Sequence, residues 1–489
     1  MSEKEFDLSY RFSGPVSFSS MTAQAFLHFG FHHEKDERAL WHFRVRESGG
    51  GYEAALFCGE KRFRGPAFCP GRKDAAHFLM DALSEAAGKP LGRWGYLLGM
   101  RPVKALYPFL SAEEAGEAQA ARFLEEEQVE PETAALLLAC FRAQQRLRER
   151  EAGDEDRRAA FYVHIPFCPS HCLYCSFPSA VVRRGSALDG FTAALCEDIR
   201  RAGALIRRKG FLVESLYFGG GTPTVLTEAQ MDRVLSAVRT YVPAERAVEW
   251  TVEAGRPDTV NPAMLEVLRA HGVDRISVNP QTMQDRILAR ISRTHGAADI
   301  LRAFREVRKA GFRTVNMDFI CGLPEQTRAD MAENLRVICQ LRPENVTIHT
   351  LAVKRGSPFF RREKEFSLPP EAEVEAMLQD AHRRLLAEGY RPYYLYRQKY
   401  MTDDFANVGY ALEGHESVYN IQMIGEHQHV IGAGAGAASK AVLPGGFRLK
   451  KLYMPRAAAV YEADLQKLCD ERDQLWDGPA DSAGTASVS

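Results

Sequence analysis

The feature that most limits the fold is an alternation of β-rich and helix-periodic segments that starts near residue 161. Six runs rich in β-branched and aromatic residues are predicted strands, at 161–165, 212–218, 248–254, 275–278, 314–320 and 345–351. After a longer first interval they recur about every 30 residues, which is the spacing of strand–helix–strand units. We therefore expect an α/β fold with a parallel sheet, either open and doubly wound or an incomplete (β/α) barrel.

Two of the intervening helices have recognisable starts. Thr227 and Gln230 have the spacing of a capping box, and Asn261 precedes Pro262 as an N-cap residue precedes a proline at the first helical position. Because ligands of parallel α/β sheets bind at the carboxyl ends of the strands, polar residues that follow the predicted strands are candidate site residues.

Changes in composition divide the chain into four parts. We expect an N-terminal accessory α+β module, a partial barrel, a C-terminal α/β extension that covers the substrate, and a disordered tail. These parts comprise residues 1–150, 155–365, 366–477 and 478–489. Residues 146–158 are almost all charged, so we interpret them as a linker.

Local patterns also predict elements outside the barrel. In the N-terminal module we expect strands at 39–45 and 51–57 and helices at 74–87 and 112–127. A long helix at 371–388 is expected to open the C-terminal extension.

The balance of charges limits the possible partners. The chain has 63 basic and 64 acidic residues, so no overall field favours nucleic acid.

No stretch approaches the ~18 apolar residues of a membrane-spanning helix. The first 20 residues contain no apolar run and no cleavage-like site. We expect a cytoplasmic protein that has no membrane span and binds no nucleic acid.

Three of the ten cysteines lie close together, directly after the first predicted strand: Cys168, Cys172 and Cys175. Thiolates are soft ligands that suit iron–sulfur clusters or zinc. Three cysteines on a four-iron (4Fe–4S) cluster leave one iron open, and the amino and carboxylate groups of S-adenosylmethionine (SAM) can chelate it. Electron transfer from the reduced cluster can then break a carbon–sulfur bond and release a 5′-deoxyadenosyl radical. A structural zinc site that uses His171, or three buried cysteines without a ligand, are the alternatives.

Polar and glycine-rich motifs follow the later strands in order. A Gly219–Gly221 turn ends the second strand, lets backbone approach a ligand and is expected to expose amide donors to the methionine end of SAM. Four polar residues lie at or after the next strand ends: Glu253, Gln281, Arg293 and Asp318. Each alone has an equally good structural explanation, but together they predict a ring of ligands around the barrel mouth.

With these motifs, the sequence resembles the radical SAM coproporphyrinogen III oxidase family, from Tyr162 to about Lys440. This family includes oxygen-independent coproporphyrinogen dehydrogenases and related heme chaperones. With its extra N-terminal module and an RQKYM motif, the chain most resembles the HemZ-type dehydrogenases. The resemblance implies an incomplete (β/α)6 radical SAM barrel, one 4Fe–4S cluster and two SAM molecules. It further implies oxidative decarboxylation of two propionates to vinyls, giving protoporphyrinogen IX.

The resemblance also implies roles for single residues. Cys168, Cys172 and Cys175 would hold the cluster. The first SAM would contact Tyr162, Gly220, Glu253 and, through backbone in a Gly/Ala run, Ala438. The second SAM would contact Tyr174, Gly221, Thr222, Gln281, Arg293, Asp318 and Ala352.

The sequence departs from the family pattern at two places. The best-studied oxidases carry a further cysteine two residues after the third ligand, where this chain has Phe177, preceded by Ser176. In this respect the chain resembles the chaperones, yet their His-Asn-x-x-Tyr-Trp motif is replaced by Tyr-Asn-Ile-Gln-Met-Ile at 419–424. A heme-binding chaperone and a radical SAM enzyme that acts on heme are therefore the alternative functions.

A porphyrinogen with four carboxylates requires cationic partners and flat apolar walls. Candidate cations are Lys354, Arg355, Arg397 and Lys399, and candidate walls are Tyr393, Tyr394 and Tyr396. Surface charges and core aromatics are the alternative interpretation of these residues. An electron donor and an electron acceptor are also required, and the sequence identifies neither.

Overall fold

The computed structural model describes residues 9–29, 32–33, 39–110, 116–151, 154–177, 180–182, 188–354, 356–397, 405–443 and 449–477. The chain forms two compact units, Met1–Phe141 and Arg142–Ser489. The helix α4 (Pro131–Glu151) crosses from the first unit into the second. No helix in the described residues is both long and apolar enough to cross a membrane.

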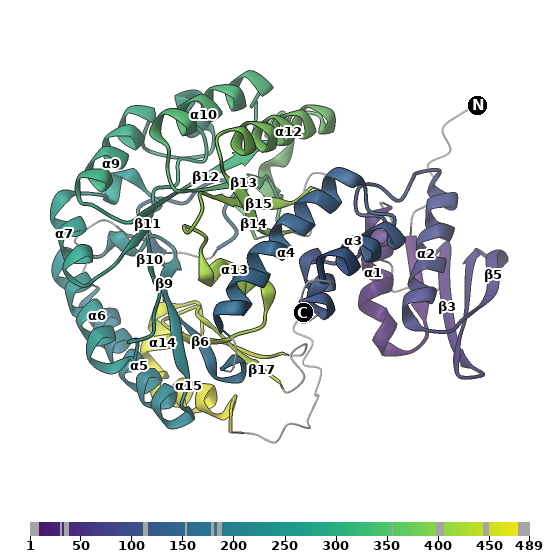
Figure 1. Ribbon diagram of the computed structural model, residues 1–489, viewed down its shortest axis with the longest axis horizontal. Coiled ribbons are helices and arrows are strands. Elements are labelled where there is room, and N and C mark those ends of the chain that lie inside the picture. Colours follow the sequence, from purple (N-terminus) through teal and green to yellow (C-terminus); the bar gives the residue numbers. More distant parts are fainter. Residues whose placement is uncertain are drawn as a thin grey trace. The chain divides into compact units, whose positions relative to one another are not determined.

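Six parallel strands form the centre of the second unit, and they lie side by side in chain order. They are β6 (Arg158–Ile165), β9 (Leu212–Gly220), β10 (Glu249–Glu253), β11 (Arg275–Ser277), β12 (Thr314–Cys321) and β13 (Asn345–Thr350). All six predicted strands are confirmed, each to within a few residues. The sheet is open, because its outermost strands in the described chain do not pair with each other. It is the predicted incomplete barrel (Figure 1).

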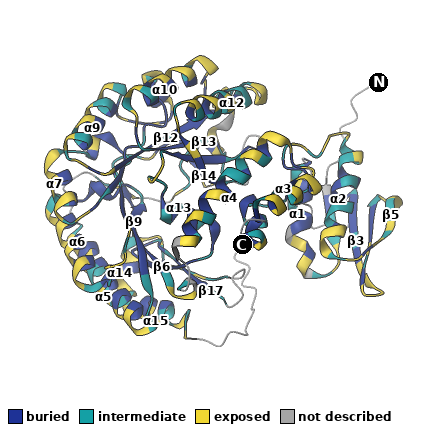
Figure 2. Ribbon diagram, in the orientation of Figure 1, coloured by how far each residue is buried: buried dark blue, intermediate teal, exposed yellow. Residues whose placement is uncertain are grey.

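Helices between the strands cover the outer face of this sheet (Figure 1). They are α5 (Asp189–Lys209), α6 (Glu228–Tyr241), α7 (Pro262–Ala270), α8 (Asp285–Arg290), α9 (Ala297–Lys309) and α10 (Arg328–Leu341). Thr227 and Asn261 cap α6 and α7 as predicted. The strands are almost entirely buried, whereas the helices expose their outer faces (Figure 2). The core therefore follows the sheet.

The C-terminal extension lengthens the sheet at both edges. After α11 (Pro358–Arg362) and α12 (Glu371–Ala387), β15 (Asn407–Ala411) pairs antiparallel with β13, and β14 (Arg391–Tyr396) pairs antiparallel with β15 at the edge. At the other edge β16 (His429–Ala433) is parallel to β6, and β17 (Ala438–Val442) and β18 (Leu449–Tyr453) follow it. The helix α12 confirms the prediction at 371–388. That the extension covers the substrate stays a prediction.

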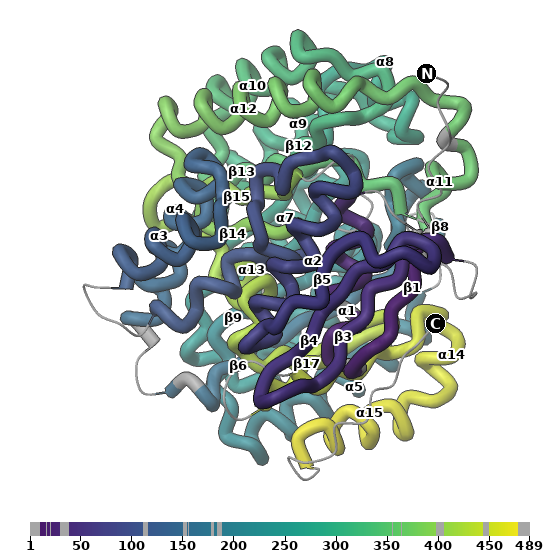
Figure 3. Tube along the Cα trace, turned by 90° about the vertical axis from the view of Figure 1, so that its right-hand side faces the viewer, coloured from purple at the N-terminus to yellow at the C-terminus, as the bar shows by residue number. Residues whose placement is uncertain are grey.

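Three further helices of this extension pack against the barrel. The helix α13 (Val418–Gly425) contacts β9 and β14. Near the C-terminus α14 (Ala458–Ala463) and α15 (Leu465–Gln474) lie along α5, as Figures 1 and 3 both show. Residues 478–489, predicted to be a disordered tail, lie outside the described residues.

The first unit has the predicted α+β character. Its sheet has the order β2 (His32–His33), β1 (Ser9–Ser13), β3 (Trp41–Ser48), β4 (Gly51–Cys58), β5 (Lys61–Cys69). Its helices are α1 (Ser19–His28), α2 (Arg72–Ala87) and α3 (Gly116–Glu126). The predicted strands at 39–45 and 51–57 and the helix at 74–87 are confirmed. The helix at 112–127 is confirmed from Gly116 onward, because residues 111–115 lie outside the described residues.

The interpretation of residues 146–158 as a linker is wrong for most of that segment. Residues 146–151 form the last turns of α4, and Arg158 already begins β6. Leu147, at 8% exposure, packs with Ile421 and Tyr394 in a small apolar cluster. The high charge therefore marks the outer face of a helix whose other face is buried.

Candidate functional site

The three clustered cysteines lie on the loop that follows β6. This loop is fixed by backbone bonds: Leu173 N–H donates to Ile291 O at 3.0 Å, and Cys175 N–H donates to Cys172 O at 3.1 Å. Cys168 ends a two-residue strand, β7 (Phe167–Cys168), that pairs with β8 (Ala180–Val181). All three thiols are free, and the Cys172 side chain is buried. The structure thus presents three thiols from one ordered loop at the carboxyl end of the first barrel strand.

The glycine turn at the end of β9 holds this loop in place. Gly221 N–H donates to Ile165 O at 2.8 Å, and Thr222 N–H donates to Phe167 O at 2.7 Å. The expectation that the glycine turn exposes its amides to SAM is therefore wrong for Gly221, whose amide the protein itself uses. That Gly220, Gly221 and Thr222 contact SAM stays a prediction.

Glycine is needed at this turn because the chains lie too close for side chains. A Cβ on Gly221 would lie 2.4 Å from Phe167 O, and one on Gly220 would lie 2.2 Å from the His164 ring. Gly220 also has a φ of +101°, which is strained for other residues. The turn therefore sets the distance between the second strand and the cysteine loop. The Thr222 hydroxyl adds a bond to Cys168 Sγ at 3.5 Å.

Residues expected around the first SAM meet on the inner face of the barrel. Tyr217 OH donates to Glu253 Oε1 at 2.6 Å, and Tyr162 is the register partner of Tyr217 on β6. Burial, together with the nearby Asp318 charge, raises the pKa of Glu253 to about 7, although the bonds from Tyr217 and Gly220 oppose the rise. Glu253 is therefore an acid that exchanges its proton near neutral pH.

Tyr419 also belongs to this group, although no motif pointed to it. Its ring stacks on Tyr217 with centroids 4.1 Å apart, and it lies 6.0 Å from the Tyr162 ring. It comes from α13, on which the sequence showed only a missing chaperone motif. Its position becomes apparent only once the C-terminal extension is folded against β9.

The Gly/Ala run at 432–439 serves the end of β6. A Cβ on Gly434 would lie 2.2 Å from His164 O, and one on Gly436 would lie 2.8 Å from the His164 ring. His164 Nδ1 forms a short hydrogen bond with Ala435 O. Ala438, the residue expected near the first SAM, begins β17 directly after this turn. The run is therefore a close-packed bridge between β16 and β6.

The residues expected around the second SAM meet on the other side of the cysteine loop. Arg293 donates to Tyr174 OH at 2.9 Å, and it also donates to Asn279 O and Gly255 O. Gln281 N–H donates to Asp318 O, at a backbone φ of +70°. Burial would raise the pKa of Asp318, but bonds from His349 and from neighbouring polar groups outweigh it and lower that pKa. Asp318 is therefore a carboxylate at neutral pH.

A cavity of about 180 Å³ opens at this side of the mouth. It is lined by Tyr174, Cys175, Ser176, Phe177, Gln281, Ile320, His349, Thr350, Leu351, Ala352, Lys354, Tyr396 and Asn407. Three of the residues expected at the second SAM, Tyr174, Gln281 and Ala352, are among these. The cavity therefore joins one cluster cysteine to the predicted SAM residues. Two cavity residues, His349 and Asn407, were missed by the sequence motifs. His349 lies within a predicted strand, Asn407 begins a strand that was not predicted, and neither belongs to a motif.

The candidate residues for porphyrinogen binding separate into three groups. Lys354 and Tyr396 line the mouth cavity. Tyr393 and Tyr394 do not, because they are buried in the core at 1% and 6% exposure, where Tyr393 OH bonds Asn345. Arg397 is absent from the described lining of the cavity. Arg355 and Lys399 lie outside the described residues.

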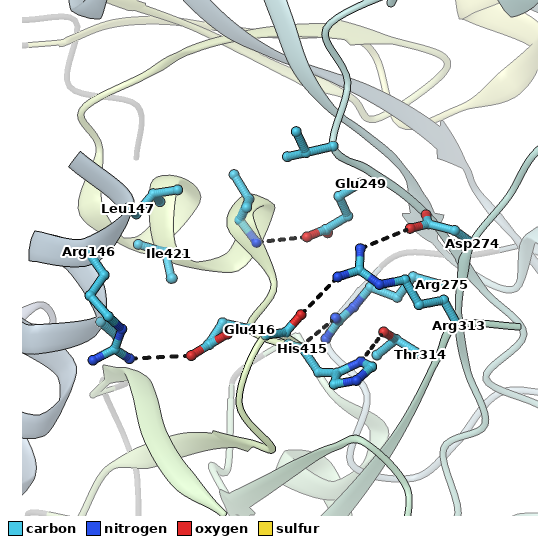
Figure 4. A pocket seen from close by; sticks show the side chains of 14 residues that line it. Arg146, Leu147, Glu249, Asp274, Arg275, Arg313, Thr314, His415, Glu416 and Ile421 are labelled. Carbon is cyan, nitrogen blue, oxygen red and sulfur yellow. Dashed lines mark hydrogen bonds and ion pairs between the residues drawn. The ribbon is translucent and has the colours of Figure 1, made fainter. Parts of the chain in front are cut away.

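A second cavity, of about 130 Å³, lies at the opposite end of the barrel (Figure 4). Its charged residues bind one another or the backbone: Arg146 pairs with Glu416 at 3.3 Å, and Arg275 donates to His415 O at 2.8 Å. Glu249 accepts bonds from Ser417 and from Val418 N–H at the start of α13. We call this end of the barrel the barrel floor. We interpret its cavity as structural, because its polar groups bond to one another.

The donor set on the cysteine loop fits an iron–sulfur cluster better than a single metal ion. Within the described residues, no three His, Cys, Asp or Glu side chains form a group that could hold one ion. A cluster requires only one thiolate at each of three irons. Burial, with smaller contributions from Cys172 and Cys168, raises the pKa of Cys175 to about 11. Metal binding would displace these protons.

Comparisons with known proteins identify the family of the chain. A family profile described as the radical SAM superfamily matches residues 162–338. The oxygen-independent coproporphyrinogen-III oxidase-like protein HemZ of Bacillus subtilis is 34% identical over 382 residues, 78% of this chain and 76% of the relative. The heme chaperone HemW of Escherichia coli is 30% identical over 299 residues, 61% of this chain and 74% of the relative.

A solved structure shares the fold. Coproporphyrinogen III oxidase (HemN) from Escherichia coli, described as a radical SAM enzyme, superimposes with a TM-score of 0.53 at 24% identity, over 66% of this chain and 73% of that chain. Together with the relatives and the cysteine loop, this places the chain in one family. The protein belongs to the radical SAM family of oxygen-independent coproporphyrinogen-III oxidase-like proteins.

Proposed function

We propose that the protein is an oxygen-independent coproporphyrinogen III dehydrogenase of heme biosynthesis. It would decarboxylate two propionates oxidatively to vinyls and so produce protoporphyrinogen IX. The family implies a 4Fe–4S cluster and SAM, and Cys168, Cys172 and Cys175 would hold the cluster. When bound, these groups supply a 5′-deoxyadenosyl radical, the hydrogen-abstracting species. The protein's part is to position substrate and cofactors and to exclude water.

The observation that carries this proposal is the position of Lys354. Its side chain lines the mouth cavity next to Cys175, whose charge acts on it, and burial lowers its pKa. An ammonium half-removed from water binds a carboxylate more strongly than an exposed one. Tyr396 and Phe177 supply flat walls in the same cavity. A cation and aromatic walls beside the cluster suit a macrocycle that carries propionates.

We further propose that two SAM molecules bind on this side of the sheet. Glu253, Tyr162, Gly220 and Ala438 would bind the first. Arg293 and Asp318 bear opposite charges and would bind the amino and carboxylate groups of the second, together with Tyr174, Gly221, Thr222, Gln281 and Ala352. We propose that the protein acts in the cytoplasm. Its electron donor and electron acceptor are unidentified.

The experiment is an anaerobic product assay on the reconstituted protein. SAM, a chemical reductant and coproporphyrinogen III are added, and protoporphyrin and 5′-deoxyadenosine are measured by mass spectrometry. Two vinyl groups per product, with 5′-deoxyadenosine formed in proportion, are the expected result. The absence of a vinyl product, together with tight stoichiometric binding of heme, would overturn the proposal.

A heme chaperone is the second candidate. The 30% identity to HemW of Escherichia coli favours it, as does Phe177 at the position where the best-studied oxidases have a further cysteine. In the assay above, it predicts heme binding without porphyrinogen turnover.

A further inference from the structure

Arg256 lies behind the cysteine loop, at a position that no motif indicated. It follows β10 by three residues and precedes the short helix η5 (Pro257–Thr259). Its side chain is 3% exposed, less than almost any other arginine of the described chain. A guanidinium buried at this depth requires strong local partners.

The partners of Arg256 direct its guanidinium at one cluster thiol. Nη1 donates to Cys172 Sγ at 3.7 Å and to Ser170 O at 3.4 Å. Nη2 donates to Thr294 Oγ1 at 3.0 Å. The planar group is thus held by a backbone carbonyl and a hydroxyl as well as by the sulfur.

The backbone of Arg256 is fixed as well. Thr259 Oγ1 donates to Arg256 O at 2.8 Å and forms a further bond with Thr224 Oγ1 at 2.6 Å. The single acid next to the guanidinium among the described residues is Asp258, with Oδ1 3.4 Å from Nε and a third of its side chain exposed. Asp258 therefore offsets part of the guanidinium charge from a partly exposed position.

A second guanidinium lies near the same thiol. Arg293 is close enough to Cys172 for their charges to interact, while its donors hold Tyr174 OH, Asn279 O and Gly255 O. The other two cysteines have weaker partners: Cys168 accepts from the Thr222 hydroxyl, and Cys175 donates to Phe177 O. Among the three cluster cysteines of the described loop, Cys172 is therefore the one whose sulfur accepts a hydrogen bond from a guanidinium.

We propose that Arg256 raises the reduction potential of the cluster by hydrogen-bonding the Cys172 thiolate. Taking up one electron adds one negative charge to the cluster. A fixed positive charge and an N–H···S bond stabilise that reduced state relative to the oxidised one. Arg256 touches the ligand and not the substrate, so it tunes the cluster through Cys172. The inference depends on the cluster and not on porphyrinogen, and it is tested without any substrate.

The test is a redox titration of the anaerobically reconstituted full-length protein without SAM. Dithionite and mediator dyes set the potential, electron paramagnetic resonance measures the reduced cluster, and iron and sulfide are counted for every sample. Arg256→Met removes charge and donor at similar length, and Arg256→Lys keeps the charge without the planar fork. Arg246→Met is the matched control, since Arg246 is two-thirds exposed and pairs with Asp154.

With full iron and sulfide content, Arg256→Met is expected to shift the midpoint potential to a more negative value. Arg256→Lys should lie between this variant and the wild type, and Arg246→Met should equal the wild type. A fully loaded Arg256→Met protein with the wild-type potential overturns the proposal. If that variant takes up no iron, Arg256→Gln is judged by the same criterion, because it removes the charge but keeps an N–H donor.

Discussion

The two ends of the barrel both bury charged residues, but they use them differently. At the floor, Glu249 and Arg275 bind groups of α13 and of the loop before it, and every bond closes within the protein. At the mouth, Arg256 donates to a cluster thiol, Arg293 lies near the same thiol, and Lys354 lines a cavity. Buried charge alone therefore does not identify a site. What distinguishes the mouth is that its buried charges face a thiol that could bind a metal cluster and a cavity that could bind a ligand.

The largest expected effect is at the mouth. Cys172→Ala should abolish both the 4Fe–4S cluster and SAM cleavage, because two thiols cannot hold the cluster. Iron content, the absorbance of the cluster and 5′-deoxyadenosine yield measure the loss. Cys196→Ala is the control, since Cys196 lies on α5 and its thiol donates only to Arg233 O. A Cys172→Ala protein that kept a full cluster would contradict the assignment of the ligands.

The next effect is at the floor. Glu249→Ala leaves the Ser417 and Thr251 hydroxyls and the Val418 N–H without their shared acceptor. We expect a loss of about 3 kcal/mol in the free energy of unfolding, because bonds to a buried carboxylate are lost. Urea denaturation followed by circular dichroism measures it. Cluster content should be unchanged, and a loss of iron without loss of stability would erase the contrast between the two ends.

The pH dependence of Glu253 should differ from that of an ordinary acid. Its folded-state pKa of about 7 lies above the ordinary 4.5, so the folded protein holds this proton more tightly. The resulting stabilisation is complete below about pH 4.5 and is lost as pH rises through 7. Relative to wild type, the cofactor-free Glu253→Gln protein should therefore gain roughly 2 kcal/mol between pH 5 and 7.5.

Unfolding curves at several pH values measure this difference, with Glu266→Gln, on the exposed side of α7, as the control. A difference between wild type and Glu253→Gln that does not change with pH would mean that burial does not raise this pKa.

A smaller effect is expected for substrate binding. Lys354→Met should raise the KM for coproporphyrinogen roughly 10-fold, the value of one charge-assisted bond to a carboxylate. The yield of 5′-deoxyadenosine without substrate should stay at the wild-type level. Lys467→Met, at a three-quarters exposed position on α15, is the control. An unchanged KM would remove Lys354 from the substrate site.

The smallest effect is expected at the rim of the floor cavity. Arg146→Met breaks the ion pair with Glu416, but Arg146 is 53% exposed, so water replaces the partner. The free energy of unfolding should change by less than about 0.5 kcal/mol. A loss comparable to that of Glu249→Ala would mean that the pair, and not the buried cap of α13, joins α4 to the barrel floor.

Much of the fold follows from local patterns. The six strands were predictable because alternating β-rich runs and the caps at Thr227 and Asn261 depend on neighbours in sequence. The interpretation of residues 146–158 as a linker was wrong because it depended on distant parts of the chain. The charged face of this helix has the same sequence pattern whether the other face is solvated or, as at Leu147, packed against α13.

The candidate site was predictable to the extent that motifs describe it. The cysteine spacing and the polar residues at strand ends located the mouth. Arg256 and Tyr419 were missed because their importance comes from partners far away in sequence, Cys172 and Tyr217. Tyr393 and Tyr394 illustrate the reverse error. Their aromatic run suggested a binding wall, yet β14 packs both rings into the core.

The central claim is that three thiols at the barrel mouth leave one iron of the cluster open for SAM. Electron paramagnetic resonance of the dithionite-reduced, reconstituted protein, recorded with and without SAM, tests this claim most directly. We predict that SAM changes the spectrum of the reduced cluster, because its amino and carboxylate groups bind the open iron. An identical spectrum with saturating SAM, in a protein that contains four irons, would contradict the account.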